Sequence, residues 1–451
     1  MSPSRRQVVV VGGGIAGLVA AYELGARHDV LVLESSPVIG GKLRLAQVGG
    51  VTVDVGAEAM LHRRPEGVEL ARELDLPVVH PAATSSRLWT RGELRPLPRS
   101  LMGVPLDLDA LTASGVLSEA GLEAVRREPT LPASRLDEDR SVADLVAERL
   151  GDEVVQRLVE PLLGGVYAGH ASRLSARATT PQLVALAREG SLVEAAARLP
   201  TPDGPVFAGL RGGLGTLPAA LAATGRFEVR TGATVRGLDR STTGFTLTFG
   251  STTAPEQVLA ERVVVACPAA PAARLLAAVA PAAAAELARI EYASMAIVTH
   301  AFRSTDLAGL AATPDSGFLV PPVERRRIKA ATYSFAKWEW VRQAGEGLLL
   351  LRTSTGRHRE EAGLQRSDGD LVAESLADLA AATGVTARPV DSHVQRWGGA
   401  LPQYAVGHLD RVERIRADVE RVPGLAVCGA AYDGVGIPAV IASARRATME
   451  P

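Results

Sequence analysis

The chain has 451 residues, of which 47% are hydrophobic and 22% are charged, and its formal net charge is −1. This length predicts more than one compact unit, and the composition excludes a disordered or fibrous protein. A nearly neutral chain has no long-range attraction to nucleic acid, so no nucleic-acid partner is expected. Only two cysteines are present, Cys267 and Cys428. They exclude a disulfide framework and favour a cytoplasmic protein.

The longest alanine-rich stretch, residues 263–290, is interrupted by prolines and charges. It could not cross a bilayer without burying those charges, so no integral membrane segment is expected. A peripheral position at a membrane remains compatible with the sequence, because a surface amphipathic helix needs no such span.

Residues 7–34 predict a strand, a glycine turn, a helix and a second strand. Gly12, Gly14 and Gly17 form the pattern G-x-G-x-x-G between the first strand and the helix. This pattern lets a dinucleotide pyrophosphate approach the backbone at a helix N-terminus. Glu34 ends the second strand, where a carboxylate can bind the ribose hydroxyls. The predicted cradle comprises Gly12, Gly13, Gly14, Ile15, Ala16, Gly17, Glu34 and Ser35.

A second glycine pair follows in residues 36–45, which read SPVIGGKLRL. This order resembles flavoproteins related to amine oxidases and desaturases, in which such a pair and a cation wrap FAD. The resemblance departs at Leu45, where those proteins usually carry a hydroxyl residue, so one hydrogen bond to the cofactor is expected to be missing or replaced. It implies cofactor contacts at Gly41, Lys42, Gly56, Ala57, Glu58 and Ala59.

The middle of the chain changes character twice. Residues 99–199 show repeated helical spacing and predict a helical domain. Residues 269–394 contain alternating runs and predict a substrate-binding domain with a mostly antiparallel sheet. The remaining segments, 1–82, 200–268 and 395–451, are expected to assemble a discontinuous Rossmann-like FAD-binding domain. The predicted fold class is therefore α/β, in a mixed α+β arrangement with a helical insert.

The C-terminal residues 424–438, GLAVCGAAYDGVGIP, again predict a strand, a glycine turn and a helix. In the flavoproteins named above this segment returns to the N-terminal sheet and meets the flavin, which implies contacts at Val435, Gly436 and Ile437. Cys428 is expected inside the strand, before that turn, so the FAD is expected to be non-covalent. The resemblance also implies Val235 near the adenine, and Trp397, before a Gly398–Gly399 turn, near the flavin.

Five further blocks occur in order along the chain: EPLLGGVYAG (160–169), FAGLRGGLGTLPAAL (207–221), GFLVPPVERRRIKAATYSFAKWEW (317–340), QRWGGALPQYAVGH (395–408) and CGAAYDGVGIPAVIASARRA (428–447). With the N-terminal motifs they resemble the porphyrinogen oxidases of haem synthesis, and most of all the coproporphyrinogen III oxidase branch of Gram-positive bacteria. The resemblance implies oxidation of coproporphyrinogen III to coproporphyrin III by removal of six electrons in three rounds. Dioxygen would be the acceptor and hydrogen peroxide a product, and the flavin, not a side chain, would carry the chemistry.

A flat substrate with ionised propionates predicts an apolar pocket with cations at its rim. Arg63 and Arg64 follow the predicted flavin loop and are expected to meet a propionate, and Tyr167 is expected to line the face of the disc. The basic run Arg325–Arg327 with Lys329 predicts a surface hairpin. The histidines have no cysteine or carboxylate at ligand spacing, so no metal site is expected.

Several alternatives remain open on the sequence. The substrate could be protoporphyrinogen IX, which has two propionates and two vinyl groups. The same fold also serves amine oxidases, carotenoid desaturases and non-enzymatic carriers like the escort proteins of small GTPases. Amine oxidases often carry Glu after the last strand glycine, whereas Gly429 is followed here by two alanines. Hand-off of the product to a ferrochelatase is not decided by the sequence.

Overall fold

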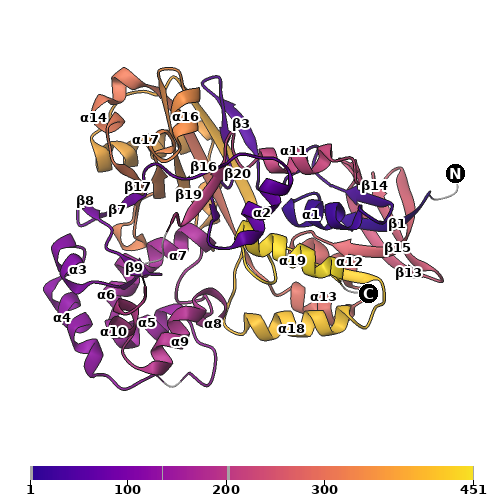
Figure 1. Ribbon diagram of the computed structural model, residues 1–451, viewed down its shortest axis with the longest axis horizontal. Helices are drawn as coiled ribbons and strands as arrows, with labels where there is room; N and C mark the ends of the chain where they lie inside the picture. Colours follow the sequence, from indigo (N-terminus) through magenta and orange to yellow (C-terminus); the bar gives the residue numbers. More distant parts are fainter. Residues whose placement is uncertain (1–3, 135, 201–203, 450–451) are drawn as a thin grey trace.

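The computed structural model describes residues 4–134, 136–200 and 204–449. It contains two large sheets and a group of helices, which occupy the right, the upper left and the lower left of Figure 1. Residues 1–3, 201–203 and 450–451 of the predicted FAD-binding segments, and residue 135 of the predicted helical domain, lie outside the described residues. The arrangement confirms the predicted mixed α/β fold.

The first sheet unites the two ends of the chain. Within the described residues its strand order is β12 (Glu228–Arg230), β2 (Val30–Leu33), β1 (Ser4–Val11), β15 (Pro255–Val265), β14 (Gly244–Gly250) and β13 (Val235–Ser241). The last strand of the chain, β21 (Leu425–Val427), pairs with the end of β15. β12, β2, β1, β15 and β21 are mutually parallel. The first and last strands are therefore separated by β15 alone.

The valines of β1 explain why helices cover both faces of this sheet. Val8 and Val10 pack with α1 (Ile15–Leu24) and α19 (Ile437–Met449), whereas Val9 and Val11 pack with the helices of the opposite face. Alternate side chains of a strand point to opposite faces, so a continuous apolar strand requires cover on both. The first face also holds α2 (Pro65–Glu73) and α11 (Thr216–Ala223), and the second holds α12 (Ala269–Leu276), α13 (Pro281–Leu287) and α18 (His408–Val419).

The second sheet has the order β20 (Asp391–Pro402), β16 (Tyr292–Arg303), β19 (Leu348–Thr355), β18 (Ile328–Thr332), β17 (Asp315–Leu319), β7 (Ser85–Thr90) and β8 (Glu93–Pro96). Neighbours are antiparallel except β17 and β7. The expected turn at Gly398–Gly399 is wrong, because β20 runs through both glycines. A bulge opposite them, between Ala293 and Met295, absorbs the irregularity.

Short elements surround this sheet. Leu371 and Leu379 of α17 (Asp368–Thr383) pack on it, and α14 (Ala308–Ala311), α15 (Ser334–Lys337) and α16 (Glu339–Ala344) lie between its strands in the chain. The hairpin of β3 (Leu45–Val48) and β4 (Val51–Asp54) packs on Ala301 and Leu350 of the sheet. This hairpin follows the first sheet directly in sequence, so it joins the two sheets. Residues 395–402, which we expected in the FAD-binding domain, are part of β20, and the domain division stays a prediction.

The helical segment has a core of its own. It comprises α3 (Leu108–Ser114), α4 (Glu119–Arg127), α5 (Val142–Leu150), α6 (Asp152–Val154), α7 (Glu160–Tyr167), α8 (Ala176–Thr179), α9 (Pro181–Glu189) and α10 (Leu192–Ala197). A hairpin, β9 (Ser100–Leu101) and β10 (Val104–Pro105), precedes it, and a π-helical turn at Val155–Val159 leads into α7. Leu319 and Val435 pack against this core from outside the segment. The helices therefore touch both the second sheet and the C-terminal glycine loop.

A small sheet of β5 (Met60–Leu61), β11 (Phe207–Leu210) and β6 (Val78–Val79) lies beside α2. In the part of the chain that the structure describes, no helix combines the length and the apolar character needed to cross a membrane.

Candidate functional site

The turn between β1 and α1 requires glycine at two positions. Gly12 has φ +110°, and a Cβ there would lie 3.0 Å from the carbonyl oxygen of Ala266. A Cβ on Gly17 would lie 1.9 Å from the carbonyl oxygen of Gly12, so only glycine lets α1 pass this close to the end of β1. The sequence pattern thus corresponds to a real packing constraint.

Gly14 is required for a different reason. It is the N-cap of α1 and offers no side-chain cap, and the first turn of the helix holds no acidic residue. A Cβ on Gly14 would meet no other atom within 4 Å. The first N–H groups of a helix have no intrahelical partner and carry its positive dipole end. The space beside Gly14 therefore suits the pyrophosphate of a dinucleotide.

Glu34 is fixed at the end of β2, next to this turn. The N–H of Gly13 donates to its Oε2 at 2.5 Å, and the N–H of Ser36 donates to its Oε1 at 2.7 Å. The N–H of Ala233 donates to the Glu34 carbonyl at 2.8 Å, which brings the start of β13 at Val235 to the same place. The structure thus brings together the residues predicted for the ribose and the adenine.

The second glycine pair stacks on the first loop. The N–H of Gly40 donates to the carbonyl of Gly13 at 2.7 Å, and a Cβ on Gly41 would lie 3.3 Å from Cα of Gly14. Lys42 follows, and burial lowers the pKa of its amine. It forms no ion pair with any residue that the structure describes. An unpaired cation beside an anion cradle fits a cofactor with two phosphates.

The loop at Gly56–Ala59 forms a third layer. The N–H of Ala57 donates to the carbonyl of Lys42 at 3.1 Å, and a Cβ on Gly56 would lie 2.0 Å from that oxygen. The indole N–H of Trp397 donates to the carbonyl of Val55 at 3.2 Å. The second sheet therefore contributes Trp397 to the same stack of loops, and its place near the flavin stays a prediction.

The carboxylate of Glu58 is engaged by the protein itself. It lies 2.7 Å from Nζ of Lys337 and 3.2 Å from Nε of Arg352, and its side chain is 6% exposed. Burial acts to raise the pKa of Glu58, but Arg352 and Lys337 hold it below its ordinary value. Arg352 also donates to the carbonyl of Gly56 at 2.8 Å. Sequence reasoning missed this triad, because its cations lie in the distant second-sheet region and no local spacing connects them to Glu58.

The C-terminal segment reaches the same edge of the first sheet. Gly429 follows β21 closely, and a Cβ on it would lie 3.8 Å from Cβ of Ala16 at the start of α1. Arg445 of α19 donates to Glu23 of α1 at 2.8 Å. Figure 1 shows α19 beside α1, with both helices beginning near the middle of the molecule. The loop with Val435, Gly436 and Ile437 thus leads into a second helix that packs beside the nucleotide-binding one.

Cys428 lies directly after β21, one residue beyond the strand in which we expected it. Its side chain is fully buried, and burial raises the pKa of its thiol to about 12. The thiol is therefore protonated and a poor nucleophile at neutral pH. This chemistry is in keeping with the non-covalent cofactor predicted from the sequence.

The three residues predicted to bind the substrate differ in their surroundings. Arg64 pairs with Glu66 at 2.7 Å, whereas Arg63 is exposed and has no ion-pair partner among the described residues. Tyr167 is 7% exposed, and its ring centroid lies 5.7 Å from that of Tyr404. Tyr404 in turn donates to the carbonyl of Ala430 in the C-terminal loop at 2.6 Å. The roles of Arg63, Arg64 and Tyr167 stay predictions.

The histidines do not gather around a metal. His62 lies 3.3 Å from His80, His170 approaches the carbonyl of His358 at 3.2 Å, and His408 stacks on Tyr404. Within the described ranges, no group of three or more histidine, cysteine or carboxylate side chains is arranged to hold a metal ion.

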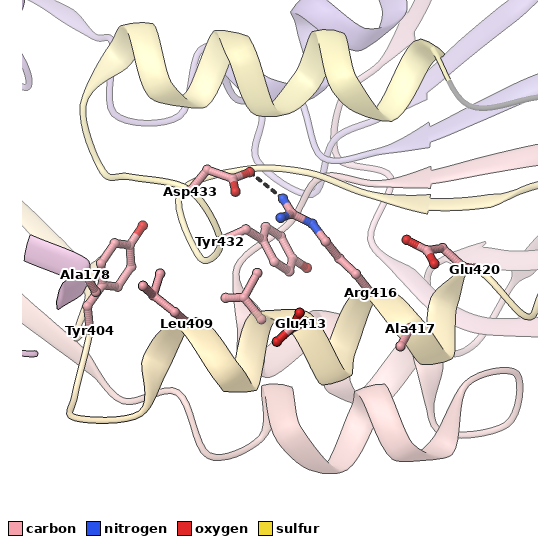
Figure 2. Close-up of a pocket in the computed structure, with 10 residues that line it drawn as sticks. Ala178, Tyr404, Leu409, Glu413, Arg416, Ala417, Glu420, Tyr432 and Asp433 are labelled. Atoms are coloured by element: carbon pink, nitrogen blue, oxygen red, sulfur yellow. Dashed lines mark hydrogen bonds and ion pairs between the residues drawn. The ribbon is translucent and has the colours of Figure 1, made fainter. Parts of the chain in front are cut away.

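A cavity of about 490 Å³ lies on the α18 side of the C-terminal loop, and Figure 2 shows the residues that line it. It is lined by Leu409, Val412, Glu413 and Arg416 of α18 and by Tyr432 and Asp433 of the loop. Arg416 donates to Asp433 at 2.5 Å and so holds the loop against the helix. None of the residues predicted to bind the cofactor or substrate lines this cavity, so we assign it no part in the reaction.

The chain is similar to known flavoproteins over nearly its whole length. The family model described as "Flavin containing amine oxidoreductase" matches residues 15–450. The chain belongs to this family. It is therefore a flavin-dependent oxidoreductase, and the dinucleotide fold at its N-terminus identifies the flavin as FAD. The residues around Gly14 and Lys42 are those that would hold its pyrophosphate.

Curated relatives match nearly the whole chain. The coproporphyrinogen III oxidase of Mycobacterium leprae (strain TN) is 39% identical and covers 98% of this chain and 97% of its own. That of Bacillus subtilis (strain 168) is 29% identical and covers 100% and 98%. A crystal structure of an Exiguobacterium sp. 255-15 protein superimposes with a TM-score of 0.86 and 32% identity, covering 99% of this chain and 98% of that chain.

The roles of Gly14 and Gly17 can be distinguished by experiment. Gly14→Ala should leave the apoprotein as stable as wild type, because Gly14 has φ −74° and its Cβ meets no protein atom. The methyl group would intrude where the pyrophosphate belongs, so the Kd for FAD should rise at least about tenfold, or about 1.4 kcal/mol. Fluorescence titration of apoprotein with FAD measures the change. An unchanged Kd would place the pyrophosphate elsewhere. Gly17→Ala is the contrasting variant, and it should lower the stability of the apoprotein itself.

The triad of Glu58 predicts a pH-dependent contribution to stability. Glu58→Gln leaves two partly buried cations without their counter-charge and should lower the free energy of unfolding by about 3 kcal/mol at neutral pH. Because the pKa of Glu58 is depressed in the fold, its contribution is present above the unfolded carboxyl pKa of about 4.3 and is lost as pH falls. Denaturant unfolding should therefore show a gap between wild type and Glu58→Gln that narrows in acid. A gap that is constant with pH would argue against the ion pairs.

Proposed function

We propose that the protein is a coproporphyrinogen III oxidase, which converts coproporphyrinogen III to coproporphyrin III in haem b synthesis. The observation that supports this most is 39% identity to the Mycobacterium leprae enzyme of that name over nearly the full length of both chains. The conversion removes six electrons and six protons in three two-electron rounds. Three molecules of dioxygen accept them and leave as three molecules of hydrogen peroxide.

When bound, FAD supplies the two-electron acceptor for each round, and the protein supplies position and charge. The first turn of α1 and Lys42 would hold its pyrophosphate, and Glu34 would hold the ribose. The stack of loops with Gly56 and Trp397 would contact the flavin ring. Arg63, which is exposed and unpaired within the described residues, meets a propionate at the rim. Tyr167 faces the disc from the helical segment.

Oxidation of protoporphyrinogen IX is the second candidate. The chloroplastic protoporphyrinogen oxidase 1 of Arabidopsis thaliana is 27% identical and covers 98% of this chain and 87% of its own. An amine substrate is less well supported. Putrescine oxidase bound to putrescine shares the fold, with a TM-score of 0.70, 17% identity and coverage of 98% of each chain.

The cytoplasm is the proposed location, since two free cysteines suit a reducing compartment. Peripheral contact with a membrane and hand-off of the porphyrin to a ferrochelatase are compatible with this proposal.

The direct test is an aerobic assay of the FAD-loaded protein with coproporphyrinogen III, protoporphyrinogen IX and putrescine as separate substrates. We expect porphyrin fluorescence and hydrogen peroxide with coproporphyrinogen III, at a kcat/KM at least tenfold above that for protoporphyrinogen IX, and no peroxide with putrescine. Peroxide from putrescine alone would replace the proposed function with amine oxidation.

The two adjacent arginines form a matched pair for locating a propionate. Arg63→Ala should raise KM for coproporphyrinogen III about tenfold with little change in kcat, because it removes a charge-assisted hydrogen bond made equally in ground and transition states. Arg64→Ala should raise KM less, because Arg64 is already paired with Glu66. Steady-state kinetics of the two variants decide between them. Equal and unchanged KM values would move the propionate site away from this loop.

A further inference from the structure

Lys329 does not lie on a surface hairpin, as its basic neighbourhood in the sequence led us to expect. Arg325, Arg326 and Arg327 are exposed, but Lys329, on β18, is only 4% exposed. Its Nζ is buried and has no hydrogen-bond partner among the described residues. A buried ammonium group without a partner is costly to keep, so this position calls for an explanation.

A second buried cation stands beside it. The N–H of Val320 donates to the carbonyl of Lys329 at 2.9 Å, and the carbonyl of the same Val320 accepts from Nη2 of Arg357 at 3.2 Å. Arg357 is 6% exposed. Burial, with a smaller effect from the charge of Arg357, lowers the pKa of Lys329 to about 7. Two basic groups, one of them an amine that is about half protonated at neutral pH, are thus brought together at the end of β17 and β18.

Carboxylates act on Arg357, whereas Lys329 has no ion-pair partner among the described residues. Glu360 and, to a smaller extent, Glu160, the first residue of α7, act on the charge of Arg357, and burial raises the pKa of Glu160 above its ordinary value. Its Oε1 accepts from the N–H of Ala171 at 2.9 Å, while its Oε2 is buried without a hydrogen bond. The two carboxylates therefore act on Arg357, and Nζ of Lys329 is left with neither a hydrogen bond nor a counter-charge among the described residues.

The cluster lies where the parts of the proposed active site meet. The N–H of His358, next to Arg357, donates to the carbonyl of Ala168, the residue that follows Tyr167 at the end of α7. Leu319 of β17 and Val435 of the C-terminal loop pack against the same helical core as Tyr167. The unpartnered amine of Lys329 and the buried guanidinium group of Arg357 thus stand behind the helix end that is proposed to face the substrate.

We propose that Lys329 and Arg357 form a carboxylate-binding subsite that takes one propionate of the porphyrinogen. This inference rests on the proposed function. An ammonium and a guanidinium group together offer a carboxylate several charge-assisted hydrogen bonds, and in a buried setting these are strong and specific. Bound propionate supplies the negative charge that the protein leaves out. The subsite therefore selects tetrapyrroles that can place a carboxylate between α7 and the second sheet.

The test uses the FAD-loaded protein and two readouts, the Kd for coproporphyrin III from porphyrin fluorescence and the KM for coproporphyrinogen III. Lys329→Met, which keeps the volume and removes the charge, should raise both at least about tenfold, and Lys329→Arg should restore them to within about threefold of wild type. Arg326→Met is the matched control, because Arg326 lies three residues away and its exposed guanidinium sits 4.3 Å from the ring centroid of Trp89. It should leave both constants unchanged.

Arg357→Gln should also raise the Kd for coproporphyrin III and the KM for coproporphyrinogen III at least about tenfold. It decides the matter if Lys329→Met fails to retain FAD. Wild-type Kd and KM in both variants would overturn the subsite and leave the two cations a purely structural role. A wild-type protein that oxidises neither porphyrinogen and binds no coproporphyrin III would overturn the proposed function itself. The two failures are therefore distinguishable.

Discussion

The close passage of α1 over the end of β1 is the constraint on which the rest of the structure depends. With a Cβ at Gly17 only 1.9 Å from the carbonyl of Gly12, the helix can begin here in this direction only because both residues are glycines. That start leaves the N-cap, Gly14, bare and its surroundings open. The loop at Gly40 then hydrogen-bonds to the first loop, and the loop at Gly56 packs on the second. Each layer has its position because the layer beneath it is fixed.

The charged side chains fall into two groups, those paired within the protein and those left for a ligand. Lys42 and Lys329, which form no ion pair among the described residues, stand at the proposed cofactor site and the proposed substrate site, where a bound phosphate or carboxylate would bring negative charge. Other cations are paired within the fold, as in the triad of Glu58, Lys337 and Arg352 that joins the loop at Gly56–Ala59 to the second sheet. A porphyrinogen with ionised propionates suits such a site, because its disc needs apolar walls and its carboxylates need localised positive charge.

Local patterns predicted the parts of this architecture that depend on neighbouring residues. The glycine turns, the strands of the first sheet and the helical segment all follow from spacing within a few tens of residues. Three features could not be predicted in this way. β20 continues through Gly398–Gly399 because β16 pairs with it, Glu58 meets Lys337 across 279 residues of sequence, and Lys329 is buried by elements outside its own hairpin. Each depends on a partner that only the tertiary fold supplies.

The central claim is that both ends of the chain hold one FAD whose ring is open to a flat tetrapyrrole. A crystal structure of the protein with FAD and coproporphyrin III tests it most directly. The account predicts the pyrophosphate beside Gly14, the flavin ring against the loop at Gly436, and the porphyrin stacked over that ring. A dinucleotide bound away from the start of α1, or a porphyrin that does not reach the flavin, would contradict it.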